Sequence, residues 1–150
     1  MKVIKSSGTS QEFTPEKLIK VLEWGCENTR VDPYELYQAI VPHLQDGMTT
    51  YDIQRAATKV AASMISIEEP DYQYVASNLA MFNLRKQVYG QFEPRSFIDQ
   101  ISFGVNHNKY DKEILAKWSA EEIAPLESKI VHDRDFEMTY AGTMQLIEKY

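Results

Sequence analysis

The residues best suited to chemistry in this sequence are lysines and threonine hydroxyls in its first fifty positions. Four lysines lie within the first twenty residues, where two acidic residues, Glu12 and Glu16, oppose them: Lys2, Lys5, Lys17 and Lys20. Thr14 and Thr50 stand where helices are expected to begin, and helix N-termini carry unpaired N–H groups and a positive dipole end. Lysines, hydroxyls and helix N-termini brought together would form an anion pocket suited to a polyphosphate.

Whether these residues converge depends on the fold. A hairpin over residues 2–13 would bring Lys5 beside Lys17 if it caps a helical bundle. Arg85 and Lys86, late in a fourth helix, would reach the same end if the helices run alternately up and down. The alternative is that these basic residues are scattered, solvated surface charge, and spacing alone leaves both interpretations open.

The residues alone indicate no catalytic centre and no metal site. The sequence has no nucleophile elbow, no Walker loop and no glycine fingerprint for a dinucleotide. His43, His107 and His132 are far apart and are accompanied by one cysteine, so a zinc site is not expected. Cys26 lies on the apolar face of a predicted helix and is expected to be a buried structural thiol. The run His132-Asp133-Arg134-Asp135 is expected to be a surface charge cluster.

Composition narrows the class of protein further. A chain of 150 residues corresponds to one domain, or to one domain with a short appendage. The net charge of −6 argues against a dedicated DNA or RNA binder, which carries a basic surface. No apolar run approaches the ~18–20 residues that span a bilayer. The single cysteine fits a reducing compartment, so we expect a soluble, intracellular protein.

The first ninety residues predict a helical bundle. Residues 2–5 and 10–13 flank a glycine-containing loop and predict a β-hairpin, which must lie on the bundle to be stable. Four helices follow, and their predicted start signals are Thr14-Pro15, Asp32-Pro33 with Glu35 as a capping box, Thr49 or Thr50, and Pro70. The first helix is expected over roughly 15–28, and the fourth is expected to end near Gly90. The expected fold is mainly α (α+β): a four-helix bundle capped by a small β-hairpin or sheet, followed by further helices.

Further helices are expected after Gly90. Pro94 is expected to start a fifth helix, Asp111 to cap a short one, and Ser119 to form a capping box with Glu122. A last amphipathic stretch, with Tyr140, Met144 and Ile147 at helical spacing, is expected to run to the terminus. The chain stops inside this helical pattern, so we expect it to be cut short.

Several motifs resemble one known family. Val3-Ile4-Lys5-Ser6-Ser7-Gly8, followed by the stretch from Phe13 to Leu18, resembles the opening motif of the ATP-cone, the regulatory nucleotide-binding domain of ribonucleotide reductases. The similarity is strongest at Pro70–Ala76 and Leu84–Pro94, and it continues to Tyr150. It covers essentially the whole chain and points to the N-terminal region of class Ia large subunits, the T-even-type phage versions in particular.

The resemblance implies a nucleotide site between the hairpin and the bundle. ATP would bind there as an activator or dATP as an inhibitor, with Mg²⁺ as a possible companion and no metal site in the chain itself. The residues that match the family's nucleotide contacts by position are Lys5, Gln11, Phe13, Thr14, Lys17, Thr50, Ile53 and Lys86. The lysines would neutralise the triphosphate, and Val3, Phe13 and Ile53 would form apolar walls for the base or ribose.

Four positions depart from the pattern of feedback-inhibited bacterial members. Ser6 stands in place of a basic residue, Gln11 in place of an acidic one, and Gln54 and Asn83 in place of histidines. These changes remove donors to the phosphates and one carboxylate acceptor. The hypothesis is that the cone fold persists while its binding is weak or no longer switches the enzyme off.

The resemblance also divides the chain. Residues 1–92 would be the ATP-cone, and residues 93–150 a helical segment that leads into a catalytic barrel, which this chain lacks. Its partners would be that barrel portion of the large subunit and the radical-generating small subunit, with no direct contact with nucleic acid or membrane. The apolar faces of residues 97–105 and 140–150 are expected to be interaction surfaces, unless they pack on each other or on the bundle.

The implied function is allosteric. The chain would be the ATP- or dATP-binding part of a ribonucleoside-diphosphate reductase large subunit, in deoxyribonucleotide synthesis for DNA replication. Without the barrel and its cysteines it would be inactive alone. It would work in the cytoplasm, that of the host if a phage encodes it. The alternative is a degenerate cone with only a structural or assembly role in a split reductase subunit. A free-standing transcription factor is disfavoured, because its zinc ribbon needs four cysteines and Cys26 is alone.

Overall fold

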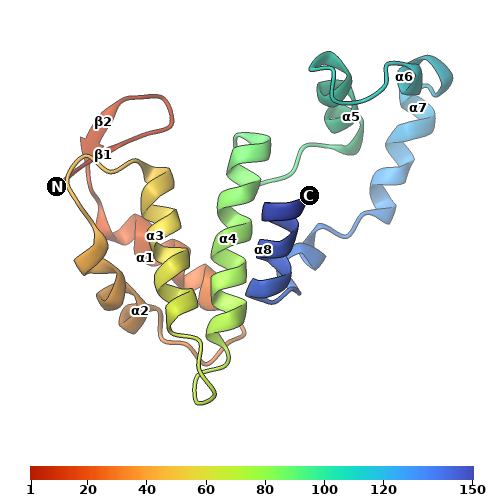
Figure 1. Ribbon diagram of the computed structural model, residues 1–150. Coiled ribbons are helices and arrows are strands. Elements are labelled where there is room, and N and C mark those ends of the chain that lie inside the picture. Colours follow the sequence, from red (N-terminus) through yellow and green to blue (C-terminus); the bar gives the residue numbers. More distant parts are fainter.

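The computed structural model describes all residues 1–150, which form helices and one small sheet (Figure 1). Strands β1 (Lys2–Ile4) and β2 (Ser10–Glu12) are antiparallel, with Val3 opposite Gln11. The four helices that follow are α1 (Pro15–Cys26), α2 (Pro33–Ile40), α3 (Thr50–Ser63) and α4 (Tyr72–Tyr89). The predicted mainly helical fold with a β-hairpin is therefore confirmed.

Local chemistry explains where these helices begin and end. The Thr49 hydroxyl accepts the N–H of Asp52 at 3.0 Å, so Thr49 is the N-cap of α3. The Asp32 carboxylate accepts from Tyr34 at 2.9 Å, so the capping box expected with Glu35 does not form. Gly90 ends α4 in the left-handed conformation, with φ of 73°, which glycine adopts without steric cost.

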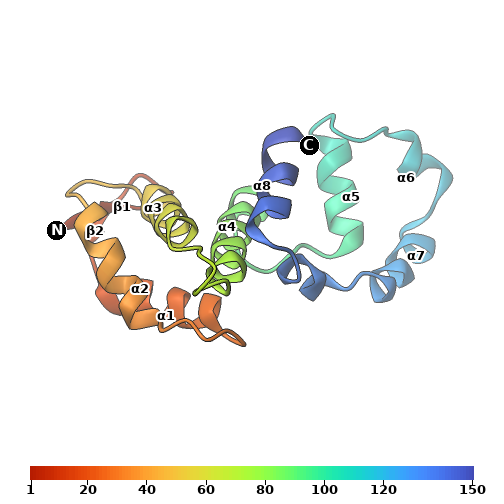
Figure 2. The ribbon, with the colours of Figure 1, turned by 60° about the horizontal axis from the view of Figure 1, so that its bottom comes forward.

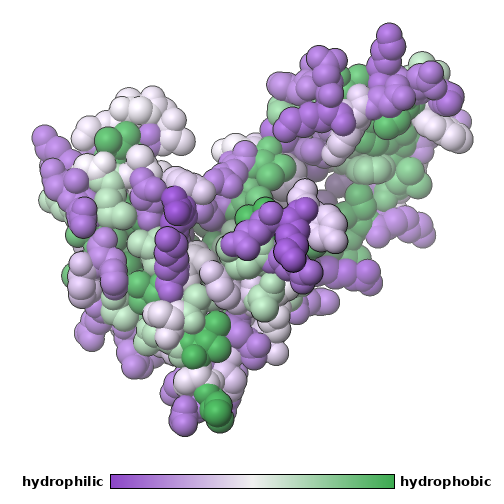
Figure 3. Space-filling model, viewed as in Figure 1, coloured by the Kyte–Doolittle hydropathy of each residue, from purple (hydrophilic) through white to green (hydrophobic).

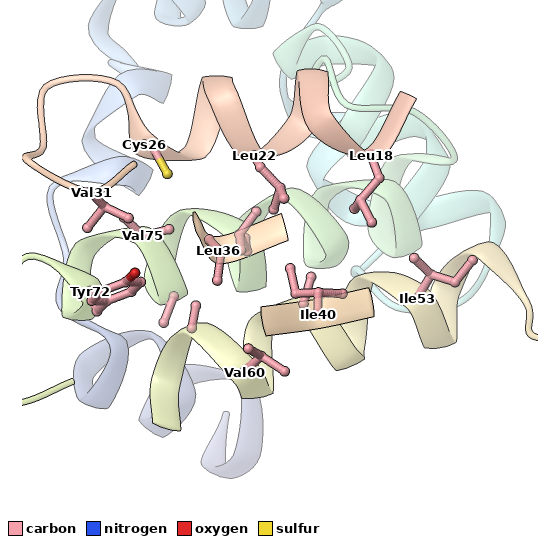
Figure 4. Close-up of a cluster of buried hydrophobic side chains, with 14 of the residues drawn as sticks. Leu18, Leu22, Cys26, Val31, Leu36, Ile40, Ile53, Val60, Tyr72 and Val75 are labelled. Atoms are coloured by element: carbon pink, nitrogen blue, oxygen red, sulfur yellow. The ribbon is translucent and has the colours of Figure 1, made fainter. Parts of the chain in front are cut away.

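The core of the bundle is a single cluster of hydrophobic side chains, most of them from α1 to α4 (Figure 4). Leu22, Leu36, Ile40 and Leu79 are fully buried within it. Cys26 is also buried, and this burial, reinforced by the Asp32 carboxylate, raises the pKa of its thiol to about 12. The thiol is therefore protonated and unreactive at neutral pH, which confirms the prediction of a structural cysteine.

The chain after α4 forms an arm and then returns to the bundle (Figures 1 and 2). The arm contains α5 (Phe97–Asn106), α6 (Glu113–Lys117) and α7 (Ala120–Ile123), followed by two 3₁₀ segments, Ala124–Lys129 and His132–Phe136. α5 packs within the arm, against α7 and Ala124–Lys129, and α8 (Tyr140–Lys149) packs against α4. The predicted capping box of Ser119 and Glu122 is present.

The inner face of α8 includes a polar residue in addition to the apolar ones that the sequence indicated. Thr143 is fully buried, and its hydroxyl lies 2.7 Å from the Ser77 hydroxyl of α4. Tyr140 packs against the core and Met144 is half-buried, whereas Ile147 is 39% exposed. A small polar pair allows close helix approach, and its hydroxyls satisfy each other, so hydropathy gave no sign of this contact. Because α8 lies on α4, residues 140–150 follow the alternative in which this stretch packs on the bundle.

The expectation for the run His132–Asp135 is wrong at one residue. Arg85 of α4 is 4% exposed, and its Nη2 donates to Asp135 Oδ2 at 2.7 Å and to the His132 carbonyl at 2.8 Å. Arg85 therefore faces away from the hairpin end of the bundle, where it was expected to lie together with Lys86. Consecutive helical residues point about 100° apart, so Arg85 and Lys86 line different cavities.

No helix in the structure combines the length and the apolar character required to cross a membrane.

Candidate functional site

A cavity of about 570 Å³ lies between the hairpin and the bundle. It is bounded by the hairpin, the first half of α1, the first turns of α3 and the last turns of α4. The sixteen residues that line it are Val3, Ser6, Gln11, Phe13, Thr14, Lys17, Leu18, Val21, Thr50, Tyr51, Ile53, Gln54, Asn83, Lys86, Gln87 and Gly90. Figure 1 shows the hairpin above the end of the bundle where these elements meet.

Backbone hydrogen bonds fix the hairpin against the start of α3. Ile4 N donates to the Met48 carbonyl at 3.0 Å, and Gly47 N donates to the Lys2 carbonyl at 2.9 Å. Lys2 N also donates to Asp46 Oδ1 at 2.6 Å. These contacts make the segment before α3 a third line of backbone beside β1, and they bring Thr50 to the cavity.

The start of α1 leaves polar groups available. Thr14 is the N-cap of α1, yet its hydroxyl accepts no hydrogen bond from the helix. Pro15, at the first helical position, has no N–H to satisfy. The Thr14 hydroxyl and the N-terminal end of α1 can therefore both act on a bound group.

The charge of the cavity lining is positive. Lys17 and Lys86 are the charged residues in the lining, and no carboxylate is among them. Lys86 Nζ lies 4.6 Å from the centre of the ring of Phe82, a residue outside the lining, so an aromatic face holds its ammonium. Two ammonium groups and two helix N-termini favour an anion.

The lining also has an apolar side. Val3 and Ile53 are buried, and Phe13, Leu18 and Val21 continue the same surface. Gln54 Oε1 is buried without a hydrogen-bond partner, which leaves an acceptor unsatisfied in this wall. A ligand that combines phosphates with a flat apolar group fits this division.

Seven of the eight residues predicted for a nucleotide site line this one cavity: Gln11, Phe13, Thr14, Lys17, Thr50, Ile53 and Lys86. Lys5 does not line it; its backbone closes the hairpin loop, with Lys5 N donating to the Thr9 carbonyl at 2.9 Å. The contact of these residues with a nucleotide stays a prediction.

Sequence reasoning missed part of the lining, and helical spacing could have found it. Starting from Thr14, the positions three, four and seven residues on are Lys17, Leu18 and Val21, which share one face of α1. The same spacing from Asn83 gives Lys86, Gln87 and Gly90. All four positions that depart from the family pattern line the cavity: Ser6, Gln11, Gln54 and Asn83.

The structure contains no group of three or more histidine, cysteine, aspartate or glutamate side chains able to hold a metal ion.

Comparison with known proteins places these observations in a family. Residues 1–87 match the model of the ATP cone domain. Over 148 residues the chain is 66% identical to the ribonucleoside-diphosphate reductase subunit alpha of Enterobacteria phage T4, covering 99% of this chain and 20% of that protein. It is 39% identical to the ribonucleoside-diphosphate reductase 1 subunit alpha of Escherichia coli K12 over 151 residues, with the same coverage. The chain thus spans about one fifth of the length of these relatives, and it belongs to the ATP-cone family.

Proposed function

We propose that the cavity binds the triphosphate and base of ATP or dATP. In this role the chain is the allosteric part of a ribonucleoside-diphosphate reductase large subunit, which serves deoxyribonucleotide synthesis for DNA replication. The observation that carries the proposal is the convergence of Gln11, Phe13, Thr14, Lys17, Thr50, Ile53 and Lys86 on one cavity without a carboxylate. Mg²⁺ would arrive on the phosphates, because the lining offers it no acidic ligand.

The lining argues for modest affinity. A charge-assisted hydrogen bond contributes about 1.5–3 kcal/mol, so Lys17 and Lys86 together supply roughly 3–6 kcal/mol. A micromolar site needs about 8 kcal/mol after the costs of association. Ser6, Gln54 and Asn83 add neutral donors and acceptors, and Lys5 lies outside the lining. We therefore expect dissociation constants between about 10 µM and 1 mM.

The proposed partners are the remainder of the large subunit and the small subunit. Apolar side chains are exposed on the arm, among them Trp118 at 56%, Leu126 at 51% and Val131 at 52%. Figure 3 shows apolar surface on the arm among polar residues. Such a surface is suited to a further protein layer. In this proposal the chain contributes regulation and no catalytic group, and it works in the cytoplasm, that of the host where a phage encodes it.

Titration calorimetry of the 150-residue chain with ATP and with dATP tests the proposal. We expect saturable binding and a roughly 10–100-fold weaker affinity in Lys86→Met, since one charge-assisted contact is lost. Lys20→Met is the matched control, because it removes the same charge from a residue outside the lining. Equal effects of the two variants would contradict the assigned site.

The neutral residues at positions 6, 54 and 83 favour one alternative, a cone that serves only structure or assembly. Absence of saturable heat with either nucleotide up to about 5 mM would support that alternative. It would mean that binding contributes less than about 3 kcal/mol of free energy. The two functions are thus separated by one measurement on the same sample.

A further inference from the structure

A second cavity, of about 720 Å³, shares no lining residue with the first. It lies between the C-terminal end of α1, the outer face of α4 and the 3₁₀ segment His132–Phe136. Nothing in the proposed nucleotide function uses it.

The floor of this cavity is aromatic. Trp24, Phe92 and Phe136 are half-buried and belong to one cluster. The Trp24 ring meets Phe92 edge-on at 5.2 Å and Phe136 edge-on at 5.1 Å between ring centres. Aromatic faces attract cations, and tryptophan attracts them most strongly.

The rim of this cavity is acidic, and its carboxylates have no ion-pair partners. Four exposed carboxylates line it: Glu27, Glu93, Asp133 and Glu137. None of the four side chains takes part in an ion pair or a hydrogen bond within the structure. The C-terminal end of α1 adds the negative end of its dipole here, and the last turn of α1 contains no basic residue.

The same floor already holds one guanidinium. Arg85 lies 4.6 Å from the centre of the Phe136 ring and 5.3 Å from that of Phe92. Its charge is paired with Asp135, which is outside the lining, at 2.7 Å. The four rim carboxylates therefore remain without a counter-charge. Asn78 also lines the cavity, and its Oδ1 is buried without a donor.

We propose that this cavity is a docking site for an arginine side chain of a partner polypeptide. An arginine combines a planar cation that stacks on aromatic rings with five donors that match carboxylates, whereas a metal ion would need a convergent ligand group, which the structure lacks. The guanidinium would lie over Trp24 and donate to Glu93 and Glu137. The occupant is thus a basic segment that carries an exposed arginine.

The test uses the 150-residue chain and a blocked Gly-Arg-Gly peptide, followed by the shifts of backbone amides in NMR spectra. A peptide with citrulline in place of arginine has nearly the same shape without the charge and is the control ligand. We expect saturable shifts at Asn28, Thr29 and Glu93 with the arginine peptide at millimolar concentration, and no saturation with the citrulline peptide. Equal shifts with both peptides, or none with either, would overturn the proposal.

A pair of variants tests the acidic rim. The double variant Glu93→Gln with Glu137→Gln should bind the arginine peptide at least about threefold more weakly, since two exposed charge contacts are lost. Glu68→Gln with Glu148→Gln removes the same charge from exposed positions outside the cavity and should leave the affinity unchanged. If both double variants behave alike, the attraction is general and the site is not where we infer it.

Discussion

The buried guanidinium of Arg85 gives the sharpest test of how the C-terminal segment is held to the bundle. Arg85 donates through Nη2 and Nε to Asp135 Oδ2, at 2.7 Å and 3.1 Å, and the side chain of Arg85 is 5% exposed. Asp135→Asn keeps the size of the side chain and removes its charge. The variant therefore leaves a buried cation with the His132 carbonyl and a neutral amide as its acceptors.

The magnitude follows from the exposure of the two partners. Loss of one partner of a buried ion pair costs about 3–5 kcal/mol. The Asp135 side chain is 40% exposed, so water reaches the abandoned guanidinium, and the asparagine oxygen still accepts one hydrogen bond. We therefore expect Asp135→Asn to lower the free energy of unfolding by about 2–3 kcal/mol. For a chain of this size the loss corresponds to a fall in Tm of about 4–12 °C.

Urea unfolding followed by circular dichroism measures this loss. Asp71→Asn is the matched control, because Asp71 pairs with Arg30 at 3.0 Å but the Arg30 side chain is 77% exposed. The control should lose less than about 1 kcal/mol. The double variant Arg85→Met with Asp135→Asn should be more stable than Asp135→Asn alone, since no buried charge remains. A double variant as unstable as the sum of its single changes would refute this reasoning.

Two further predictions concern the arm and the buried thiol. Gly104→Ala should destabilise the arm by about 1–3 kcal/mol, because the added Cβ would meet the Tyr110 ring at 2.2 Å. Gly142→Ala should be neutral or stabilising, because the atom nearest to its Cβ is 3.8 Å away. Hydrogen exchange of the α5 amides should be faster in Gly104→Ala and unchanged in Gly142→Ala. For Cys26, a pKa raised from 9.0 to about 12 means that the unfolded chain ionises first. Its contribution to stability is complete below pH 9 and is lost as the pH rises from 9 towards 12, and labelling by a thiol reagent at pH 8 should be as slow as unfolding. Rapid labelling of the folded chain would contradict the burial.

The parts of the fold that depend on neighbouring residues could be predicted from the sequence. Thr49 caps α3, Gly90 ends α4, and Ser119 forms a capping box with Glu122, because these devices act within a few residues. Helix N-termini and helical spacing predict part of the cavity lining, such as Thr14, Lys17 and Thr50, whereas Gln11 and Phe13 were expected only from the resemblance to the ATP-cone.

Long-range polar pairs could not be predicted in this way. Arg85 and Asp135 are 50 positions apart, and Ser77 and Thr143 are 66 positions apart. A buried arginine has the same hydropathy as an exposed one, so only the position of its partner distinguishes the two. Lys5 shows the reverse case: its position in the motif suggested a place in the lining, but the geometry of the hairpin leaves it outside.

Helix α4 connects the bundle with the C-terminal segment because different faces of the helix contact each of them. Asn83, Lys86 and Gln87 face the first cavity, while Ser77 and Arg85 hold α8 and the segment before it. The helix ends at Gly90, and Arg95 then donates to the carbonyl of Val88 at 3.1 Å, which ties the start of the arm to its last turn. A ligand that shifts the last turns of α4 would therefore also change the contacts that hold the arm and α8. In the proposed function, a nucleotide bound under the hairpin would contact the same helix that holds the arm and α8.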